Sequence, residues 1–231
     1  MHELKPVLIV VLFAVVFVAV IYSAIQGAMQ ERKRLEGLIA LSRRLNLGFS
    51  AGLNYAIADR FNFLKQLAQG DNRYAMYVLA GSYQQNDVLV FDYHYQTEST
   101  DSKGNRTTTH HWFSFFILTL PAHFPDLTIR RENLFAKVAE VFGYGDINFE
   151  SAEFSKTFNV RSPDKKFAYD VCNAQMIEYL LANRDLSVEI ENNVLALAFT
   201  TRLSPEEIET NLQRLVAIRT RLPEYLFAQT T

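Results

Sequence analysis

The chain begins with an uninterrupted apolar run. Residues 6–30 contain no charged side chain, and residues 6–25 read PVLIVVLFAVVFVAVIYSAI. At about 1.5 Å per residue, a helix of this length covers roughly 30 Å, the thickness of the hydrocarbon layer of a bilayer. The run lacks the polar stripe of a helix buried in a soluble core. We therefore predict a short tip over residues 1–5 and a single transmembrane helix over residues 6–30. A cleaved signal peptide is the alternative that Ala24 and Ala28 leave open.

The charges that flank this run predict its orientation. Residues 32–34 are all basic, and Arg43 and Arg44 follow them, whereas Lys5 stands beside Glu3 before the helix. Cytoplasmic flanks carry the excess of Lys and Arg. We therefore expect the N-terminus outside and the main domain in the cytoplasm.

The periodicity changes after the membrane helix. Residues 31–46 are rich in helix formers and predict a juxtamembrane helix that continues the anchor. A second short helix is expected over residues 59–67. Beyond it, Val, Phe, Tyr and Thr alternate with polar residues, which is typical of strands. The expected strands are residues 73–82, 87–96 and 107–120, joined by polar turns into an antiparallel meander.

The remaining chain mixes helical and alternating patterns. Pro121 and Pro125 are expected to end the third strand. The further expected elements are a helix over 132–142, a strand over 154–161, a helix over 162–182 with Ser162 as its N-cap, a hairpin of strands 186–190 and 194–200 turned at Asn192 and Asn193, and a helix over 204–222 opened by a capping box of Ser204 and Glu207. Strands in runs followed by helices, without regular βαβ alternation, predict an α+β fold for one domain over residues 47–231.

Composition narrows the class of protein. The 231 residues are 49% hydrophobic and 21% charged, carry a net charge of −2 and include one cysteine. One cysteine excludes an internal disulfide scaffold, and the apolar content argues against disorder. Because nucleic-acid binders normally show a basic excess, we expect no nucleic-acid partner.

Motifs for common chemistry are absent. Residues 143–146 (GYGD) lack the third glycine of a dinucleotide-binding loop, so we interpret them as a turn. Cys172 lies on an expected apolar helix face, where a buried thiol is commoner than a nucleophile. Glu206 and Glu207 are explained by the helix N-terminus, which favours negative charge. We therefore assign no catalytic, cofactor-binding or metal-binding residue and expect no cofactor.

The histidines on the meander are the one group of residues that could support catalysis or metal binding. A four-residue loop over 101–104 would place His94 opposite His111, whereas a turn at Gly104 and Asn105 would place it opposite Phe115. A catalytic zinc needs three protein ligands. The third would have to be Asp92, which we expect on the opposite face, or a remote residue. We therefore interpret His94, His110 and His111 as structural or exposed.

Aromatic residues accompany these histidines. They form either a binding surface or one side of the core, and we favour the core. The residues are Tyr93, Tyr95, Trp112 and Phe116.

A segment of the carboxyl half resembles a known family. Residues 153–162 (EFSKTFNVRS), followed by Phe-Ala-Tyr at 167–169 and Met176-Ile177, are similar to the C-terminal part of a family of bacterial membrane-associated proteins of unknown function. The resemblance implies a bacterial inner-membrane setting and implies no activity.

Together these patterns predict a single-pass protein of the bacterial inner membrane. We expect a non-enzymatic module that binds a protein or lipid partner at the cytoplasmic face, and homo-oligomerisation is compatible with this. The alternatives are a structural or assembly subunit of a membrane complex, and a membrane-bound enzyme that uses the meander histidines.

Overall fold

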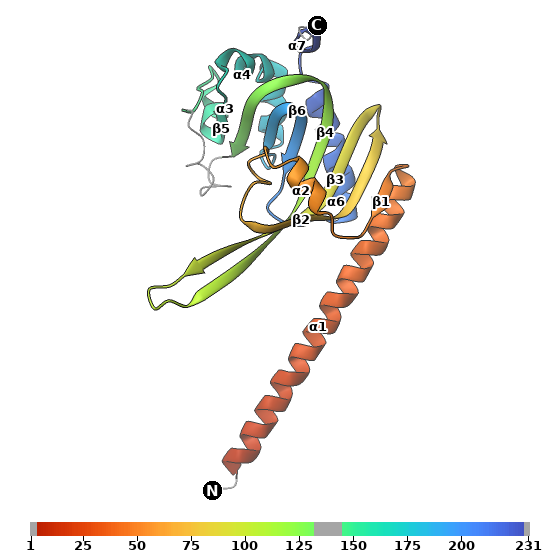
Figure 1. Cartoon of the computed structure of the whole chain (residues 1–231), viewed down its shortest axis with the longest axis vertical. Helices are drawn as coiled ribbons and strands as arrows, with labels where there is room; N and C mark the ends of the chain where they lie inside the picture. The colour runs from red at the N-terminus through yellow and green to blue at the C-terminus, as the bar shows by residue number, and fades with distance from the viewer. Residues whose placement is uncertain (1–3, 132–144, 229–231) are drawn as a thin grey trace.

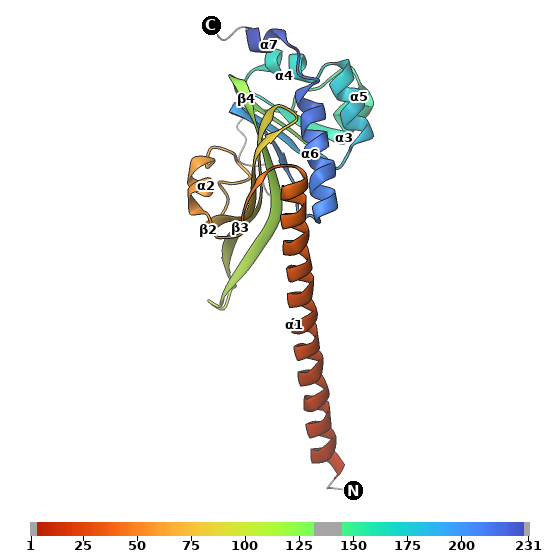
Figure 2. The ribbon, with the colours of Figure 1, turned by 90° about the vertical axis from the view of Figure 1, so that its right-hand side faces the viewer.

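A computed structural model describes residues 4–131 and 145–228. One long helix, α1 (Leu4–Arg44), projects from a domain built around an antiparallel sheet (Figures 1 and 2). The remaining elements are β1 (Gly48–Ser50), α2 (Tyr55–Arg60), β2 (Asp71–Tyr83), β3 (Asn86–Thr100), β4 (Arg106–Arg131), α3 (Ala152–Thr157), β5 (Phe158–Arg161), α4 (Lys165–Val171), α5 (Ala174–Ala182), β6 (Val188–Ala198), α6 (Pro205–Arg219) and α7 (Tyr225–Ala228). The predicted α+β class is confirmed.

The N-terminal helix is continuous, as predicted from its two halves. No break separates the apolar run from the charged stretch that follows it. From Leu12 onward α1 is long and apolar enough to cross a membrane, and none of its apolar window is buried by the domain. A signal sequence shares these properties, so they identify an apolar N-terminal helix without giving its orientation.

The sheet has strand order β1-β2-β3-β4-β5, and the sixth strand, β6, also pairs with β4. All pairings are antiparallel. The predicted meander of β2, β3 and β4 is confirmed. Strand β4 is long enough to pair with β3 through its first half, with β6 through its middle and with β5 at its end.

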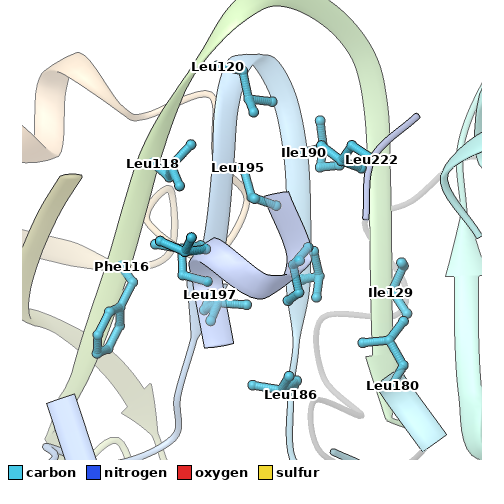
Figure 3. Close-up of a cluster of buried hydrophobic side chains, with 14 of the residues drawn as sticks. Phe116, Leu118, Leu120, Ile129, Leu180, Leu186, Ile190, Leu195, Leu197 and Leu222 are labelled. Carbon is cyan, nitrogen blue, oxygen red and sulfur yellow. The ribbon is translucent and has the colours of Figure 1, made fainter. Parts of the chain in front are cut away.

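The prediction that Pro121 and Pro125 end a strand is wrong. Strand β4 runs through both prolines to Arg131, and its pairing with β6 shifts register around Phe124. Proline lacks a backbone N–H, so it is tolerated where the ladder is interrupted by such irregularities. The strand arches at this point, and β6 arches inside it (Figure 3). Asn192, at φ 52°, pairs with Phe124 in this bend, so the predicted hairpin at Asn192 and Asn193 is one bent strand.

Other elements of the carboxyl half are shorter than predicted. The expected strand over 154–161 begins as helix α3, capped by Ser151, and only β5 is extended. The expected helix over 162–182 is two helices, capped by Asp164 and Asn173 rather than by Ser162. Helix α6 has the predicted capping box of Ser204 and Glu207. The helix expected over 132–142 lies outside the described residues.

Two apolar cores cover the two faces of the sheet. Alternate residues of β3 point to opposite sides, so Val88 and Val90 join one core while Phe91 and Tyr93 join the other. The larger core, part of which Figure 3 shows, packs the sheet against α4, α5, α6 and the end of α1. The smaller one lies under α2 and the loop that follows it. The end of α1 is thus part of the domain's core.

Candidate functional site: the junction of anchor and domain

A buried carboxylate joins the long N-terminal helix α1 to the sheet. Asp92 of β3 is 2% exposed, on the sheet face that α1 covers. Arg34 of α1 donates from Nη1 and Nη2 to its two oxygens, at 2.7 and 2.9 Å. Arg202, in the loop before α6, donates from Nε at 2.8 Å, and Ser114 Oγ donates from β4 at 2.8 Å. One carboxylate therefore holds three segments that lie far apart in the sequence.

The same guanidinium groups extend this network to neighbouring backbone and side chains. Arg34 Nε donates to the carbonyl of Leu203 at 2.9 Å, and Arg202 Nη2 donates to Glu31 at 2.6 Å. Burial alone would raise the pKa of Glu31, but hydrogen bonds from Arg202 and Tyr77 outweigh burial and lower it. Both guanidinium groups also lie over the ring of Tyr77. We call Glu31, Arg34, Asp92, Ser114 and Arg202 the junction network.

Apolar contacts reinforce the junction one turn further along the helix. Leu38 and Leu41 are 0% and 2% exposed and belong to the larger core. Arg44 forms a bidentate pair with Glu209 of α6 at 2.6 Å. Helix α1 therefore enters the domain without a flexible linker, and its direction is fixed by polar and apolar contacts together.

A pocket of about 450 Å³ opens beside the junction network. It lies between α1 and the start of α6, with Gly27, Gln30 and Glu207 among its walls. Its two arginines are Arg34 and Arg202, whose hydrogen bonds are already directed to Asp92, Glu31 and Leu203. The pocket therefore presents few free donors to a ligand.

The histidine register differs from both arrangements considered from the sequence. The hairpin closes over five residues, with Thr100 opposite Arg106, so His94 faces Trp112 and Tyr95 faces His111. His110 then lies diagonally across from His94, and its Nδ1 is 2.9 Å from His94 Nε2. The prediction that Asp92 lies on the opposite face from His94 is also wrong, because residues two apart on a strand share a face.

The hydrogen bonds of His94 define its tautomer. Its Nδ1 lies 3.0 Å from the carbonyl oxygen of Asn72, which only accepts, so Nδ1 carries the proton. Nε2 is then an acceptor, and His110 Nδ1 donates to it. The ring of His94 also packs against Tyr74 and Trp112. Burial lowers the pKa of His94, with a smaller contribution from the nearby His110. Neither nitrogen of His94 is free to act on a substrate.

Replacing His110 with Ala tests this arrangement. The neutral ring of His94 loses the hydrogen bond to Nε2, and the contribution of His110 that lowers the pKa of His94 is removed. The pKa of His94 should therefore rise toward its ordinary value. Nitrogen chemical shifts of the histidine rings, followed by NMR as a function of pH, measure this change. His123→Ala, an exposed histidine on the arch of β4, is the matched control and should leave the titration of His94 unchanged. An unaltered pKa of His94 in His110→Ala would contradict the assigned bond.

Of the other residues considered from the sequence, only Trp112 contacts the junction network among the described residues. Tyr93, Tyr95 and Phe116 are buried, which confirms the core interpretation, whereas Trp112 is half-buried beside His94 and under the guanidinium of Arg202. Cys172 is buried, and burial raises the pKa of its thiol. It lines an apolar pocket of about 580 Å³ between α4 and α5. Among the described residues, no three His, Cys, Asp or Glu side chains are grouped so as to hold a metal ion.

A cluster of carboxylates lies on the other face of the sheet. Glu189 of β6 is 4% exposed, accepts from the backbone N–H of Lys65 at 3.0 Å and pairs with Arg130 at 3.5 Å. Burial raises the pKa of Glu189. Burial, together with the nearby Asp126 and Glu189, raises the pKa of Glu191 from 4.5 to about 7. Glu191 therefore titrates near neutral pH.

This shift predicts a pH dependence of stability. Between pH 4.5 and about 7 the folded chain keeps a proton on Glu191 that the unfolded chain has released, so this group favours folding more as the pH falls. Glu191→Gln should abolish the effect, which we expect to be about 1–2 kcal/mol after allowance for partial solvent screening. Denaturant unfolding of both proteins at pH 5 and pH 8 measures it. Parallel pH profiles for the two proteins would contradict the raised pKa.

Comparisons with known proteins give one structural similarity. The sequence matches no protein-family model and no curated protein. The structure is similar to the crystal structure of the mycobacterial trehalose monomycolate transport factor A, TtfA, with a TM-score of 0.58 and 11% sequence identity. The similarity covers 83% of this chain and 97% of the TtfA chain. At this identity the similarity establishes the fold alone. The resemblance of residues 153–177 to a bacterial membrane-associated family stays a prediction.

Proposed function

We propose that this chain is a membrane-tethered, non-enzymatic module of a lipid-transport system. In this proposal residues 6–30 span the bacterial inner membrane, residues 31–46 form the juxtamembrane helix, and residues 47–231 form a cytoplasmic domain that binds a lipid or protein partner. The single observation that carries the proposal is the junction network, through which Arg34 of the anchor helix binds the buried Asp92 of the sheet.

The junction network supports a positioning role. A domain that only needs to be near a membrane can be attached to its membrane helix through a flexible linker. Here the helix is continuous into the domain, and burying Asp92 is tolerable because both arginines and Ser114 satisfy its oxygens. In this proposal α1 spans the bilayer, so a rigid junction gives the domain one orientation relative to the bilayer. Such an orientation matters for a module that must meet a lipid or a membrane partner on one defined face.

The similarity to a trehalose monomycolate transport factor supports the assignment to lipid transport. The alternative of an enzyme using the meander histidines has weaker support, because both nitrogens of His94 are already hydrogen-bonded. A structural subunit of a membrane complex is compatible with the same rigid junction, and it differs from a lipid-binding module in what contacts the domain.

Site-specific photo-crosslinking in cells tests the proposal. A photoreactive amino acid replaces Gln30, which lines the pocket at the junction, in the full-length chain. We expect crosslinks to lipid or to one reproducible membrane protein. The matched control carries the same amino acid at Gln175, an exposed position of α5, and should give neither product. Helix α5 lies at the end of the domain away from the projecting half of α1 (Figure 2).

Two results would contradict the proposal. If the full-length chain is released from membranes by alkaline extraction, the tether is wrong. If it stays in the membrane but position 30 gives no lipid or protein adduct beyond the control, the proposed binding role at this face is wrong.

A further inference from the structure

We propose that the tip of the β3–β4 hairpin, residues 97–110, lies among the lipid headgroups of the bilayer that holds α1. This inference rests on the proposed membrane tether and adds a second contact with the same bilayer. The interacting surface is the exposed tip of the hairpin, and its partner is the layer of phosphate-bearing headgroups.

The hairpin extends well beyond the rest of the sheet. It leaves the domain on the side toward which the N-terminal half of α1 also projects (Figures 1 and 2). Every residue from Thr97 to His110 is exposed, and none of them is apolar. Two-stranded ribbons with neither face covered are only marginally stable in water. A ribbon of this kind is suited to reach a surface outside the domain.

The reach follows from two lengths that start at the junction network. Arg34 and Asp92 are hydrogen-bonded to each other, so they give a common starting point for measuring along α1 and along β3. From Arg34 back to Ile25, where the apolar run ends, the helix covers about 14 Å at about 1.5 Å per residue. From Asp92 to Thr100 the strand covers about 26 Å at about 3.3 Å per residue. The hairpin is therefore longer than the part of α1 that lies between Arg34 and the membrane-spanning segment, whether that segment ends at Ile25 or at Gln30. It runs obliquely to α1 (Figure 1), so we infer that its tip reaches the headgroup layer.

Aromatic residues occupy the level between the junction and the tip. Tyr74, His94 and Trp112 stack together on the face of the sheet that also carries Asp92, one step closer to the tip. Tyr55, which is 53% exposed, contacts Tyr74 at a ring separation of 5.6 Å. Trp and Tyr are enriched at the interface of membrane proteins because their rings combine an apolar body with a polar atom.

The chemistry of the tip suits headgroups rather than acyl chains. Asp101 closes the loop, because its carboxylate accepts hydrogen bonds from the backbone of Lys103 and Asn105 and from the Asn105 side chain. The side chains of Lys103 and Arg106 have no hydrogen bond or ion pair within the part of the chain that the structure describes. The segment also carries two carboxylates, of which Asp101 is engaged in the loop and Glu98 lies further back on β3. At the loop itself, Lys103 and Arg106 can bind phosphate oxygens.

Fluorescence quenching in vesicles tests the inference. Ser102→Cys, at the tip, is labelled with an environment-sensitive fluorophore in the full-length chain, while the buried Cys172 stays unreactive. The chain is reconstituted into vesicles of phosphatidylethanolamine and phosphatidylglycerol that contain a lipid with a nitroxide on its headgroup. We expect strong quenching of this label. A label at Gln175→Cys on α5 should be quenched little.

Charge reversal tests the role of the two cations. Lys103→Glu with Arg106→Glu should lower the population of quenched tips on the order of tenfold in these vesicles. Lys165→Glu with Lys166→Glu makes the same change of charge at the start of α4. It breaks the exposed ion pair of Lys166 with Asp170 but should leave the quenching at Ser102 unchanged.

Three outcomes separate this inference from the proposed function. Vesicles that fail to retain the chain on flotation would overturn the tether itself. A retained chain whose tip is quenched no more than Gln175 would overturn the headgroup contact alone. Stronger quenching by a nitroxide deep in the acyl chain than by one on the headgroup would also overturn it.

Discussion

Asp92→Ala should lower the free energy of unfolding of the full-length protein by about 3–5 kcal/mol, because it leaves the charges of two half-buried arginines without their shared partner. Arg34 and Arg202 have side chains that are 14% and 25% exposed, so solvent replaces the lost carboxylate only in part. The hydroxyl of Ser114 also loses its acceptor. Denaturant titration of the detergent-solubilised chain, followed by circular dichroism, measures the change.

Asp87→Ala is the matched control for this substitution. Asp87 lies on the same strand but is exposed, and its carboxylate has no ion pair among the described residues. We expect a change within about 0.5 kcal/mol, as for most surface substitutions. Equal effects of the two substitutions would mean that Asp92 does not hold the junction.

Leu38→Ala should destabilise the protein by about 2–5 kcal/mol, the range for buried leucines that leave a cavity. Leu38 is 0% exposed, although it belongs to the long helix that projects from the domain. Its loss should therefore loosen the anchor as well as the core. Thermal unfolding of the full-length chain measures the first effect. Limited proteolysis between the anchor and the domain measures the second.

Leu53→Ala removes the same side chain from an exposed position and serves as the control. Leu53 is 55% exposed, so its truncation leaves no cavity and should change the stability by less than about 0.5 kcal/mol. A Leu38→Ala protein as stable as this control would show that α1 is not part of the core.

Local patterns predict much of the fold because their causes are local. The capping box of Ser204 and Glu207 is satisfied within one helical turn, and the apolar run of α1 needs no tertiary partner to be recognised. The bend of β4 is different. Proline usually interrupts a strand, which is why Pro121 and Pro125 predict an end to β4. Here, however, β6 arches with β4 and the ladder resumes at Leu127. That outcome depends on pairing between distant segments, so sequence pattern alone cannot provide it.

The junction network was missed for the same reason. Arg34 and Arg202 lie 58 and 110 residues from Asp92 along the chain. One signal was available, since Val88, Val90 and Asp92 share a face of β3, and a charge on an otherwise apolar face calls for a buried partner. Which histidine pairs with His94 depends on the length of the β3–β4 loop. A five-residue loop rather than a four-residue loop brings His110, instead of His111, to His94.

The distance between the anchor and the far side of the domain tests the central claim most directly. Spin labels at Ala28→Cys on α1 and Gln175→Cys on α5 are measured by double electron–electron resonance in the full-length chain, reconstituted in lipid nanodiscs. The account predicts one narrow distance distribution, which Asp92→Ala broadens. A broad distribution in the otherwise unaltered chain would show that the domain moves freely on its anchor, and would contradict a fixed orientation at the membrane.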